Sequence, residues 1–337
     1  MRRSTIQSVV ACLASAGCLV WLFYDVNWPR LLEDMSGIDW GWVSLAIALN
    51  VISYLFQGWR WQLLMRPKGS VSAWSATEAI YVGLFANSVL PLRVGELVRG
   101  YLMARRLKVD FSAILPSIVV ERLFDGIWMA LSIGAAAIFV RQLPPNVLKA
   151  GDILGWIVLV YTVLFLFAIL RKGSQSKEVR FRWLRGPAKF FGALAADLRE
   201  IGRSRALYLS FAVSFLLLLA QIAAFWLVMP AYGIRLSFLS GAVVLLIMHL
   251  GTMIPNAPAN LGTYQVFTVI GLELFGVEKT LAAGFSLVAF FLLSLPLAVI
   301  GAIAAGRTGM TLAGMRAVGR TSSHTLAAKN LGDGSAA

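Results

Sequence analysis

The sequence predicts an all-α polytopic membrane protein with eight membrane elements, of which six are full spans and two are broken hairpins. Hydrophobic residues make up 59% of the 337-residue chain and charged residues only 14%, whereas soluble domains are nearer a quarter charged. Several apolar runs reach the roughly 20 residues that cross a bilayer. Two further apolar stretches are interrupted by proline and glycine at corresponding positions, which is typical of a binding site inside a transporter.

Six apolar runs are expected to be full spans: residues 6–24, 43–59, 111–140, 153–170, 207–229 and 281–305. The first contains Ala-Ser-Ala at 14–16, which is similar to a signal-peptide cleavage site, but the apolar residues continue through Phe23 and favour an uncleaved span. Cys12 and Cys18 lie six residues apart on this helix and indicate neither a disulfide nor a metal framework. We expect one transmembrane domain over residues 1–310.

Two apolar stretches carry the breaks: residues 76–103 with Pro91 and Gly95, and residues 238–275 with Pro258 and Gly262. Proline removes a backbone donor and glycine permits conformations that other residues avoid. The freed backbone groups cannot face lipid, so they must be covered by protein or line a wet cavity. We therefore expect two re-entrant hairpins; the alternative is a pair of full spans joined by a tight turn at each break.

The placement of charge predicts the topology. The formal net charge is +14, and Lys and Arg collect in alternate loops, which are expected to be cytoplasmic. Both termini are then cytoplasmic, with a flexible tail over residues 311–337. The basic charge serves topology and contact with anionic lipid, and it does not indicate nucleic-acid binding.

Two halves of the chain follow the same order of elements. The two prolines and the two glycines of the breaks are each 167 residues apart. Shifting the chain by 167 also aligns the neighbouring spans, so that residues 1–145 and 150–310 form two repeats. Each half has three full spans, an odd number, so the second half begins on the opposite side. The sequence therefore predicts an inverted-topology repeat whose hairpins enter from opposite faces.

The basic cytoplasmic loop at residues 171–206 has its own pattern. After Gly186, apolar residues recur at helical spacing and charged residues occupy the other positions. This pattern favours a helix on the inner leaflet that is drawn by anionic headgroups. An ordinary solvated connecting helix remains the alternative.

Charged residues within the apolar stretches form the candidate substrate-binding site, because intramembrane ionisable groups are costly and usually functional. They are Arg93, Glu96 and Arg99 in the first hairpin and Glu121, Arg122 and Asp125 in the third span. Arginine is a natural phosphate ligand, since its planar fork donates two hydrogen bonds. We expect Arg93 and Arg122 to hold an anionic headgroup and the three acids to orient them. The alternative is a structural ion-pair cluster, or, for Arg99, a position at the inner surface.

The second half is neutral at the corresponding positions. Glu121, Arg122 and Asp125 correspond to Val288, Ala289 and Leu292. We therefore expect headgroup recognition at the first hairpin and a neutral gate or exit near Pro258 and Gly262. The residues of the hairpin breaks and gate are Pro91, Gly95, Pro258, Asn260, Gly262 and Gln265. His249 is interpreted as a hydrogen-bonded core residue rather than a proton relay.

Enzyme motifs do not appear. Asp125-Gly126 is similar to the start of the CDP-alcohol phosphotransferase signature, but residues 127–140 contain none of the further acids that hold metal there. Two histidines without metal-ligand spacing, and no P-loop, G-x-S-x-G or dinucleotide fingerprint, predict neither a metal nor a cofactor.

The charged motifs together carry a family resemblance: Pro91-x-Arg93-x-Gly95-Glu96-x-x-Arg99, then Glu121-Arg122-x-x-Asp125, then Pro258-x-x-x-Gly262. In this order they resemble the lysylphosphatidylglycerol synthase transmembrane-region family, a flippase-like module, over nearly the whole chain. The resemblance implies a multi-pass protein of the bacterial cytoplasmic (inner) membrane that moves or handles polar lipids, some of them hopanoid-linked. Gln265 departs from the glutamate expected there. Only about 31 residues follow the last span, far below a domain, so the synthase activity is not expected.

Three functions remain open. The first is a lipid translocase or lipid-handling transporter for a polar, anionic or isoprenoid/hopanoid-type lipid, driven by a lipid gradient, an ion gradient or a partner. The second is an intramembrane lipid transferase with Glu96, Glu121 or Asp125 as general base. The third is a non-catalytic partner of a lipid-synthesis enzyme, and a homo-oligomer is compatible with each.

Overall fold

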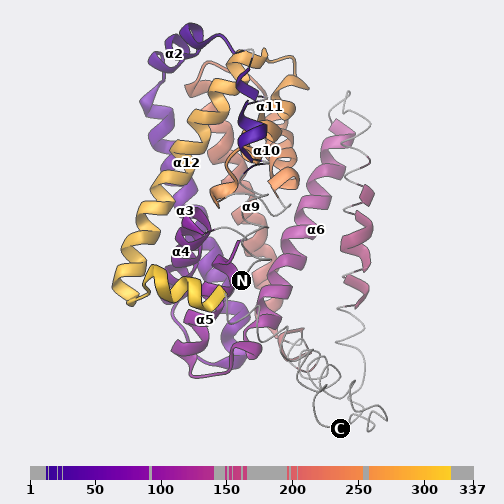
Figure 1. The fold of residues 1–337 in the computed structure, drawn as a ribbon. Helices are drawn as coiled ribbons and strands as arrows, with labels where there is room; N and C mark the ends of the chain where they lie inside the picture. Colours follow the sequence, from indigo (N-terminus) through magenta and orange to yellow (C-terminus); the bar gives the residue numbers. More distant parts are fainter. Residues whose placement is uncertain are drawn as a thin grey trace, which may run out of the picture.

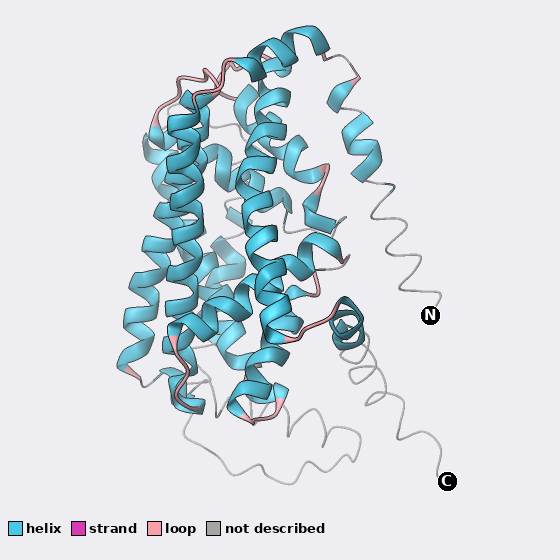
Figure 2. Ribbon diagram, turned by 90° about the vertical axis from the view of Figure 1, so that its left-hand side faces the viewer, coloured by secondary structure: helices cyan, strands magenta, loops and turns pink. Residues whose placement is uncertain are grey.

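The computed structural model describes residues 13, 15–20, 22–24, 26–90, 93–139, 149, 152–153, 155–160, 162–164, 196, 199–202, 204–252 and 258–319. Every regular element in this part of the chain is a helix (Figure 2), which confirms the all-α prediction. Three of these helices are long and apolar enough to cross a membrane, at Trp40–Lys68, Arg205–Ala231 and Lys279–Thr308.

The α-helices are α2 (Trp28–Ser36), α3 (Trp40–Met65), α4 (Ala73–Val89), α5 (Gly95–Leu107), α6 (Leu115–Phe139), α9 (Arg205–Ala231), α10 (Phe238–Thr252), α11 (Thr263–Glu273) and α12 (Lys279–Thr308). Short 3-10 turns occupy η1 (Arg66–Lys68), η2 (Phe111–Ala113) and η3 (Pro258–Asn260).

The long helices lie where the apolar runs predict them, with longer ends. α3 continues six residues past the expected end at 59, α9 and α12 extend their runs by two or three residues at each end, and η2 precedes α6 in the third run. The described parts of the runs at 6–24 and 153–170 are helical. Most of the loop at 171–206 lies outside the described residues; of its expected surface helix, residues 196 and 199–202 are described and helical, and Ile201 is buried.

Two features of the structure differ from the expectations. α2 is a surface helix within an expected loop; Asn27 caps it, with its side chain accepting from Arg30 N, and Leu31 is buried. Residues 312–319, expected to belong to a flexible tail, form a helix that lies across the long helices near α5 (Figure 1). Met315 on this helix is fully buried in the same apolar cluster as Val98 of α5. The rest of the expected tail, from residue 320, lies outside the described residues.

Four helices are too short to cross a bilayer. α4, α5, α10 and α11 have 17, 13, 15 and 11 residues, whereas a full span needs about 20. In Figure 1, α4 and α5 lie in the lower part of the molecule and α10 and α11 in the upper part. The ends of these helices therefore approach one another near the middle of the long helices.

The backbone at these breaks adopts the left-handed region, which interrupts a right-handed helix. Arg93 has φ 52°, and Ala259, Asn260 and Gly262 have φ 57°, 61° and 89°. Pro91 and residues 253–257 lie outside the described residues. The helix bounds of the first group, α3 to α6, recur 167 residues later as α9 to α12, within four residues at every boundary.

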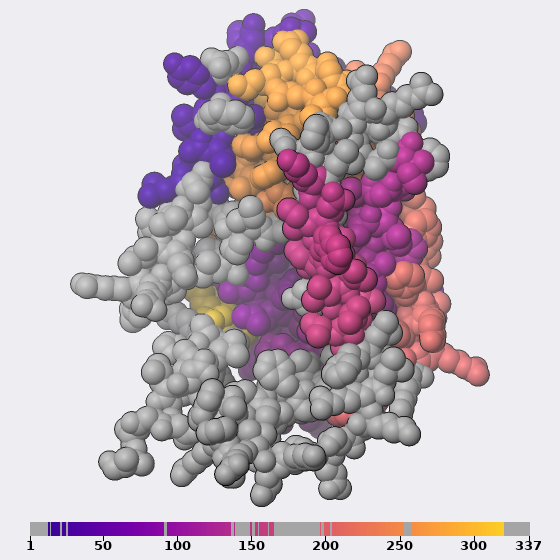
Figure 3. Space-filling model, turned by 90° about the vertical axis from the view of Figure 1, so that its right-hand side faces the viewer, coloured from indigo at the N-terminus to yellow at the C-terminus, as the bar shows by residue number. Residues whose placement is uncertain are grey.

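The core divides into two main apolar clusters. The upper cluster joins α9, α10, α11 and α12 around Phe225 and Phe285, and the lower one joins α3, α4, α5 and α12 around Trp61 and Val98. α3 and α9, which occupy equivalent places in the two groups, pack along each other at the centre (Figure 1). α12 also packs closely along α4, whereas α6 and α10 make a smaller contact around Ile133 and Leu246. The described residues at 152–164 cover the outer side of α6 (Figure 3).

Candidate functional site

The tips of the two breaks contact each other through Arg93 and Asn260. Arg93 Nε and Nη2 donate to Asn260 Oδ1 at 3.2 and 2.9 Å, and Nη2 also donates to the carbonyl of Thr252 at the end of α10. That carbonyl belongs to the last turn of a helix, where carbonyls have no intrahelical partner. Residues 93 and 260 are themselves 167 apart, and both have positive φ. Equivalent positions of the two groups of helices therefore bind each other.

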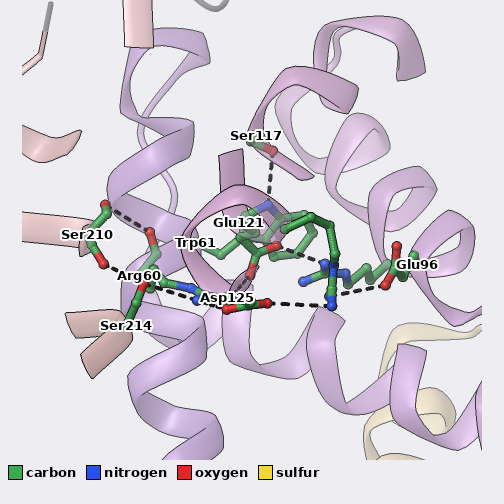
Figure 4. Close-up of polar contacts among 10 residues, drawn as sticks. Arg60, Trp61, Glu96, Ser117, Glu121, Asp125, Ser210 and Ser214 are labelled. Atoms are coloured by element: carbon green, nitrogen blue, oxygen red, sulfur yellow. Dashed lines mark hydrogen bonds and ion pairs between the residues drawn. The ribbon is translucent and has the colours of Figure 1, made fainter. Parts of the chain in front are cut away.

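A fully buried arginine, Arg60 on α3, holds two carboxylates of α6 (Figure 4). Its Nη2 lies 2.7 Å from Glu121 Oε1 and its Nη1 lies 2.5 Å from Asp125 Oδ1. Nη1 also donates to Ser214 Oγ on α9 at 3.1 Å. A buried charge is tolerated only when it is paired and hydrogen-bonded. The network therefore explains how α3 can carry a charged residue at a fully buried position.

Arg99 approaches the same carboxylate from the other side. It is only 3% exposed, and its Nη2 lies 2.8 Å from Glu121 Oε2. The two groups are not aligned for a hydrogen bond, so the contact is electrostatic. The Arg99 guanidinium stacks 4.8 Å above the ring of Trp61, whose Nε1 donates to Ser117 Oγ at 3.0 Å. Glu121 thus joins α3, α5 and α6 through two buried arginines.

A second group of charges borders this network and is accessible. The Arg122 side chain is 51% exposed, and its Nη2 lies 3.1 Å from Glu96 Oε1 on α5. Its Nη1 lies 3.5 Å from Asp125 Oδ2, one helical turn away. The side chains of Glu96 and Asp125 are 42% and 34% exposed. Arg122, Glu96 and Asp125 can therefore meet a ligand, while Arg60, Arg99 and Glu121 cannot without rearrangement.

Each break contains a glycine that the local packing requires. A Cβ on Gly95 would lie 2.1 Å from the carbonyl oxygen of Gly83 in α4. A Cβ on Gly262, which has positive φ, would lie 2.6 Å from the carbonyl oxygen of Ser15. Any other residue at either position would push apart segments that now touch.

A side-chain amide oxygen caps the helix that follows each break. The Gly95 N–H donates to Asn87 Oδ1 at 2.7 Å, and the Gly262 N–H donates to Gln265 Oε1 at 2.7 Å. Gln265 is fully buried, and its Nε2 has no hydrogen-bond partner among the described residues. Of the expected gate residues, Gln265 is thus a buried cap, Pro258 begins η3, and Asn260 contacts the other tip.

The structure brings the expected charged residues together and corrects two assignments. Arg99 is buried within the protein and not exposed at its surface, because Glu121 and Trp61 enclose its guanidinium. The set of three arginines and three acids named from the sequence is also incomplete, because Arg60 joins the cluster. Its position next to residue 59 favoured a loop assignment. The apolar residues that continue through Met65 were the signal for a longer helix.

His249 lies on α10 within electrostatic range of Asp125 and Arg93. In the described part of the chain, no three His, Cys, Asp or Glu side chains gather closely enough to hold a metal ion.

Comparison with known proteins gives one family match and several relatives. The family model of the lysylphosphatidylglycerol synthase TM region matches residues 8–301. Glycosyltransferase AglD of Haloferax volcanii is 29% identical over 125 residues, which cover 37% of this chain and 20% of AglD. A UPF0104 membrane protein of Methanothermobacter thermautotrophicus is 21% identical over 277 residues, 77% of this chain and 81% of that protein. Another UPF0104 membrane protein, from Methanocaldococcus jannaschii, is 24% identical over 199 residues, which cover 58% of this chain and 82% of that protein.

The chain therefore matches most of the length of the UPF0104 relatives and only a fifth of the length of AglD. The expected family resemblance is confirmed by a match that covers most of the sequence and includes every charged residue of the candidate site. The chain is a membrane protein and belongs to the family of the lysylphosphatidylglycerol synthase TM region.

Proposed function

We propose that this protein is a flippase-like lipid translocase that binds a polar headgroup near the middle of the membrane. One observation carries the proposal. The tips of two helix pairs, each too short to span, meet at Arg93 and Asn260, beside the accessible charges of Glu96, Arg122 and Asp125. Broken helices whose ends meet at mid-membrane are typical of transporter substrate sites.

The inverted repeat expected from the sequence is part of this proposal. The recurrence of helix bounds after 167 residues supports it, as does the entry of the two short pairs from opposite ends in Figure 1. Arg66, Lys68, Arg105 and Arg106 gather at the end where α3 and α5 finish, which supports a cytoplasmic location for that end. We propose a cytoplasmic membrane location with both termini inside.

The accessible and buried charges have different proposed roles. Arg93 and Arg122 bind the headgroup phosphate, and Glu96 and Asp125 orient Arg122 through the contacts at 3.1 and 3.5 Å. Arg60, Arg99 and Glu121 form a fixed base that holds α3, α5 and α6 in register. The loop at 171–206 contacts anionic lipid at the inner leaflet.

Reconstitution tests the function directly. The full chain and its Arg93→Ala and Arg122→Ala variants are placed in liposomes with fluorescent lipid in one leaflet, and transfer is followed by chemical quenching of the accessible dye. We expect each variant to lose at least about tenfold in rate, the effect of one lost charge-assisted hydrogen bond. Arg30→Ala is the matched control, because Arg30 forms an exposed ion pair with Glu278 at 3.0 Å, at the far end of α12.

Two results would reject the proposal. A parent protein that transfers no lipid faster than empty liposomes argues against translocation. Equal rates for the parent, Arg93→Ala and Arg122→Ala argue against the site.

A second candidate function is an intramembrane transferase acting on a lipid-linked donor. The similarity to part of a glycosyltransferase favours it, and so do the exposed carboxylates of Glu96 and Asp125. Glu121 is a poor base for this reaction because Arg60 and Arg99 enclose it. A modified lipid that mass spectrometry detects in membranes with the parent protein, and not with Glu96→Gln or Asp125→Asn, would support this function over translocation.

A further inference from the structure

We propose that the central site selects a lipid headgroup with one net negative charge, and that Arg93 is the residue that sets this preference. The inference rests on the proposed function and specifies the class of lipid. It follows from Arg60, which turns a balanced cluster into one with an excess positive charge.

The charges of the described site can be counted from its contacts. Four arginines and three acids gather there, and with His249 neutral the formal charge is +1: Arg60, Arg93, Arg99, Arg122, Glu96, Glu121 and Asp125. The neighbouring Arg106 and Glu78 form an ion pair of their own and cancel. The site therefore holds one more positive charge than its acids neutralise.

The excess charge is located at Arg93. Arg60, Arg99 and Arg122 each have a carboxylate oxygen within 3.1 Å. Arg93 has none at ion-pair distance among the described residues, and its guanidinium donates to two neutral oxygens, of Asn260 and Thr252. These oxygens satisfy hydrogen bonds but supply no countercharge.

An anionic phosphodiester would complete the site. In a medium of low dielectric constant, an uncompensated charge is costly and an opposite charge nearby is strongly favourable. A phosphodiester brings one negative charge and two oxygens that match the guanidinium fork. The N-termini of α5 and α11 lie on either side of the tip contact, and their dipoles also favour an anion. A zwitterion would leave the excess positive charge, and a dianion would reverse it.

Asn260 occupies the position that a phosphate oxygen would take. Its Oδ1 accepts from both Arg93 Nε and Arg93 Nη2, as one phosphate oxygen can. A headgroup that binds Arg93 therefore competes with Asn260, and its entry separates the two tips. Binding of an anionic headgroup and separation of the two tips are thus linked through the contact between Arg93 and Asn260.

The variant Asn260→Asp tests the charge count with little change of shape. A carboxylate replaces the amide at the same position, keeps both bonds from Arg93 and cancels the excess charge. The purified full-length protein is incubated with equal amounts of phosphatidylglycerol, phosphatidylcholine and phosphatidic acid of identical acyl chains, and retained lipid is measured by native mass spectrometry. We expect the parent to prefer phosphatidylglycerol and Asn260→Asp to lose that preference by about tenfold.

Three further variants separate charge from shape. Asn260→Ala removes the competing oxygen without adding charge and should keep the preference for phosphatidylglycerol. Arg93→Gln reaches a net charge of zero by another route and should lose it, as Asn260→Asp does. Glu96→Gln raises the charge to +2 and should shift the preference toward phosphatidic acid.

Two outcomes overturn the inference: Asn260→Asp and Arg93→Gln keep the headgroup preference of the parent, or Asn260→Ala loses it as completely as Asn260→Asp. The binding readout is independent of transport. If the preference follows charge but proteoliposomes move no lipid, the translocase proposal fails and the charge selection stands. If lipid moves without regard to headgroup charge, the selection fails and the translocase stands.

Discussion

The two helix pairs that break near the middle of the molecule share a backbone plan and differ in chemistry. At equivalent positions the first tip has Arg93 where the second has Asn260, and α6 carries Glu121 where α12 carries buried Val288. α12 packs closely along α4, whereas α6 makes a smaller apolar contact with α10 around Ile133 and Leu246. The charged cluster thus lies on α3, α5 and α6, whereas α9 to α12 supply mainly the upper apolar cluster.

Two glycines at equivalent positions, one in α12 and one in α6, differ in how closely their surroundings are packed. A Cβ on Gly301 of α12 would lie 2.4 Å from the Tyr81 carbonyl oxygen in α4, but no described atom lies within 4 Å of a Cβ on Gly134 of α6. Residues 134 and 301 are again 167 apart. The same residue type is therefore required by packing in one half and unconstrained in the other.

The largest expected effect comes from removing the buried arginine of the charged half. Arg60→Ala leaves Glu121 with one arginine and Asp125 with a half-exposed partner, so we expect a loss of about 3–5 kcal/mol of stability. Thermal unfolding in detergent measures it. Arg66→Ala, at an exposed site just beyond α3, is the control and should stay within about 0.5 kcal/mol. Equal stability of the two variants would mean that the buried network does not hold the charged half together.

The next largest effect is expected from substituting the equivalent glycines, which should change the stability of the protein differently in the two halves. Gly301→Ala forces α12 away from α4 and should cost about 1–3 kcal/mol. Gly134→Ala has room for its methyl group and gains helix propensity, so it should be neutral or stabilising by up to about 1 kcal/mol. The same unfolding assay compares them, and a larger loss for Gly134→Ala would contradict the closer packing of α12.

Loss of each cap should loosen its own break: Asn87 reaches from α4 to Gly95, and Gln265 reaches back within α11 to Gly262. Asn87→Ala and Gln265→Ala each remove an acceptor at 2.7 Å from a glycine N–H, which should cost about 1 kcal/mol or somewhat more. Hydrogen exchange of the Gly95 and Gly262 amides measures the local opening. Protection that is unchanged in both variants would exclude the capping role, and Ser36→Ala on exposed α2 serves as the control.

The smallest expected loss of protein stability comes from removing one of the accessible charges. Glu96→Gln breaks a half-exposed ion pair with Arg122, which should cost less than about 1 kcal/mol. Its unfolding temperature should therefore remain close to that of the parent, while its headgroup preference changes. A large drop in the unfolding temperature would instead make Glu96 part of the structural network.

Particular residues show how far sequence patterns predicted the site. Arg122 and Asp125 lie three residues apart on one helix, a spacing at which side chains can pair, and their charged groups lie 3.5 Å apart. The pairs of Glu121 with Arg60 and Arg99 join three helices and have no such local signature. Gln265 could be recognised as unusual for the family, but its role as a cap depends on the path of the backbone at Gly262.

The sequence by itself determined the helical membrane class, the position of the breaks and the spacing of 167, because these depend on the length of apolar runs and on the backbone limits of proline and glycine. The tertiary structure alone decided which charges are buried, which remain accessible, and that Arg93 contacts its own equivalent, Asn260. The physical reason is that a charge is neutralised by whatever lies within a few ångströms of it. That neighbourhood is created by the packing of α3, α5, α6 and α10 and is not encoded in spacing along the chain.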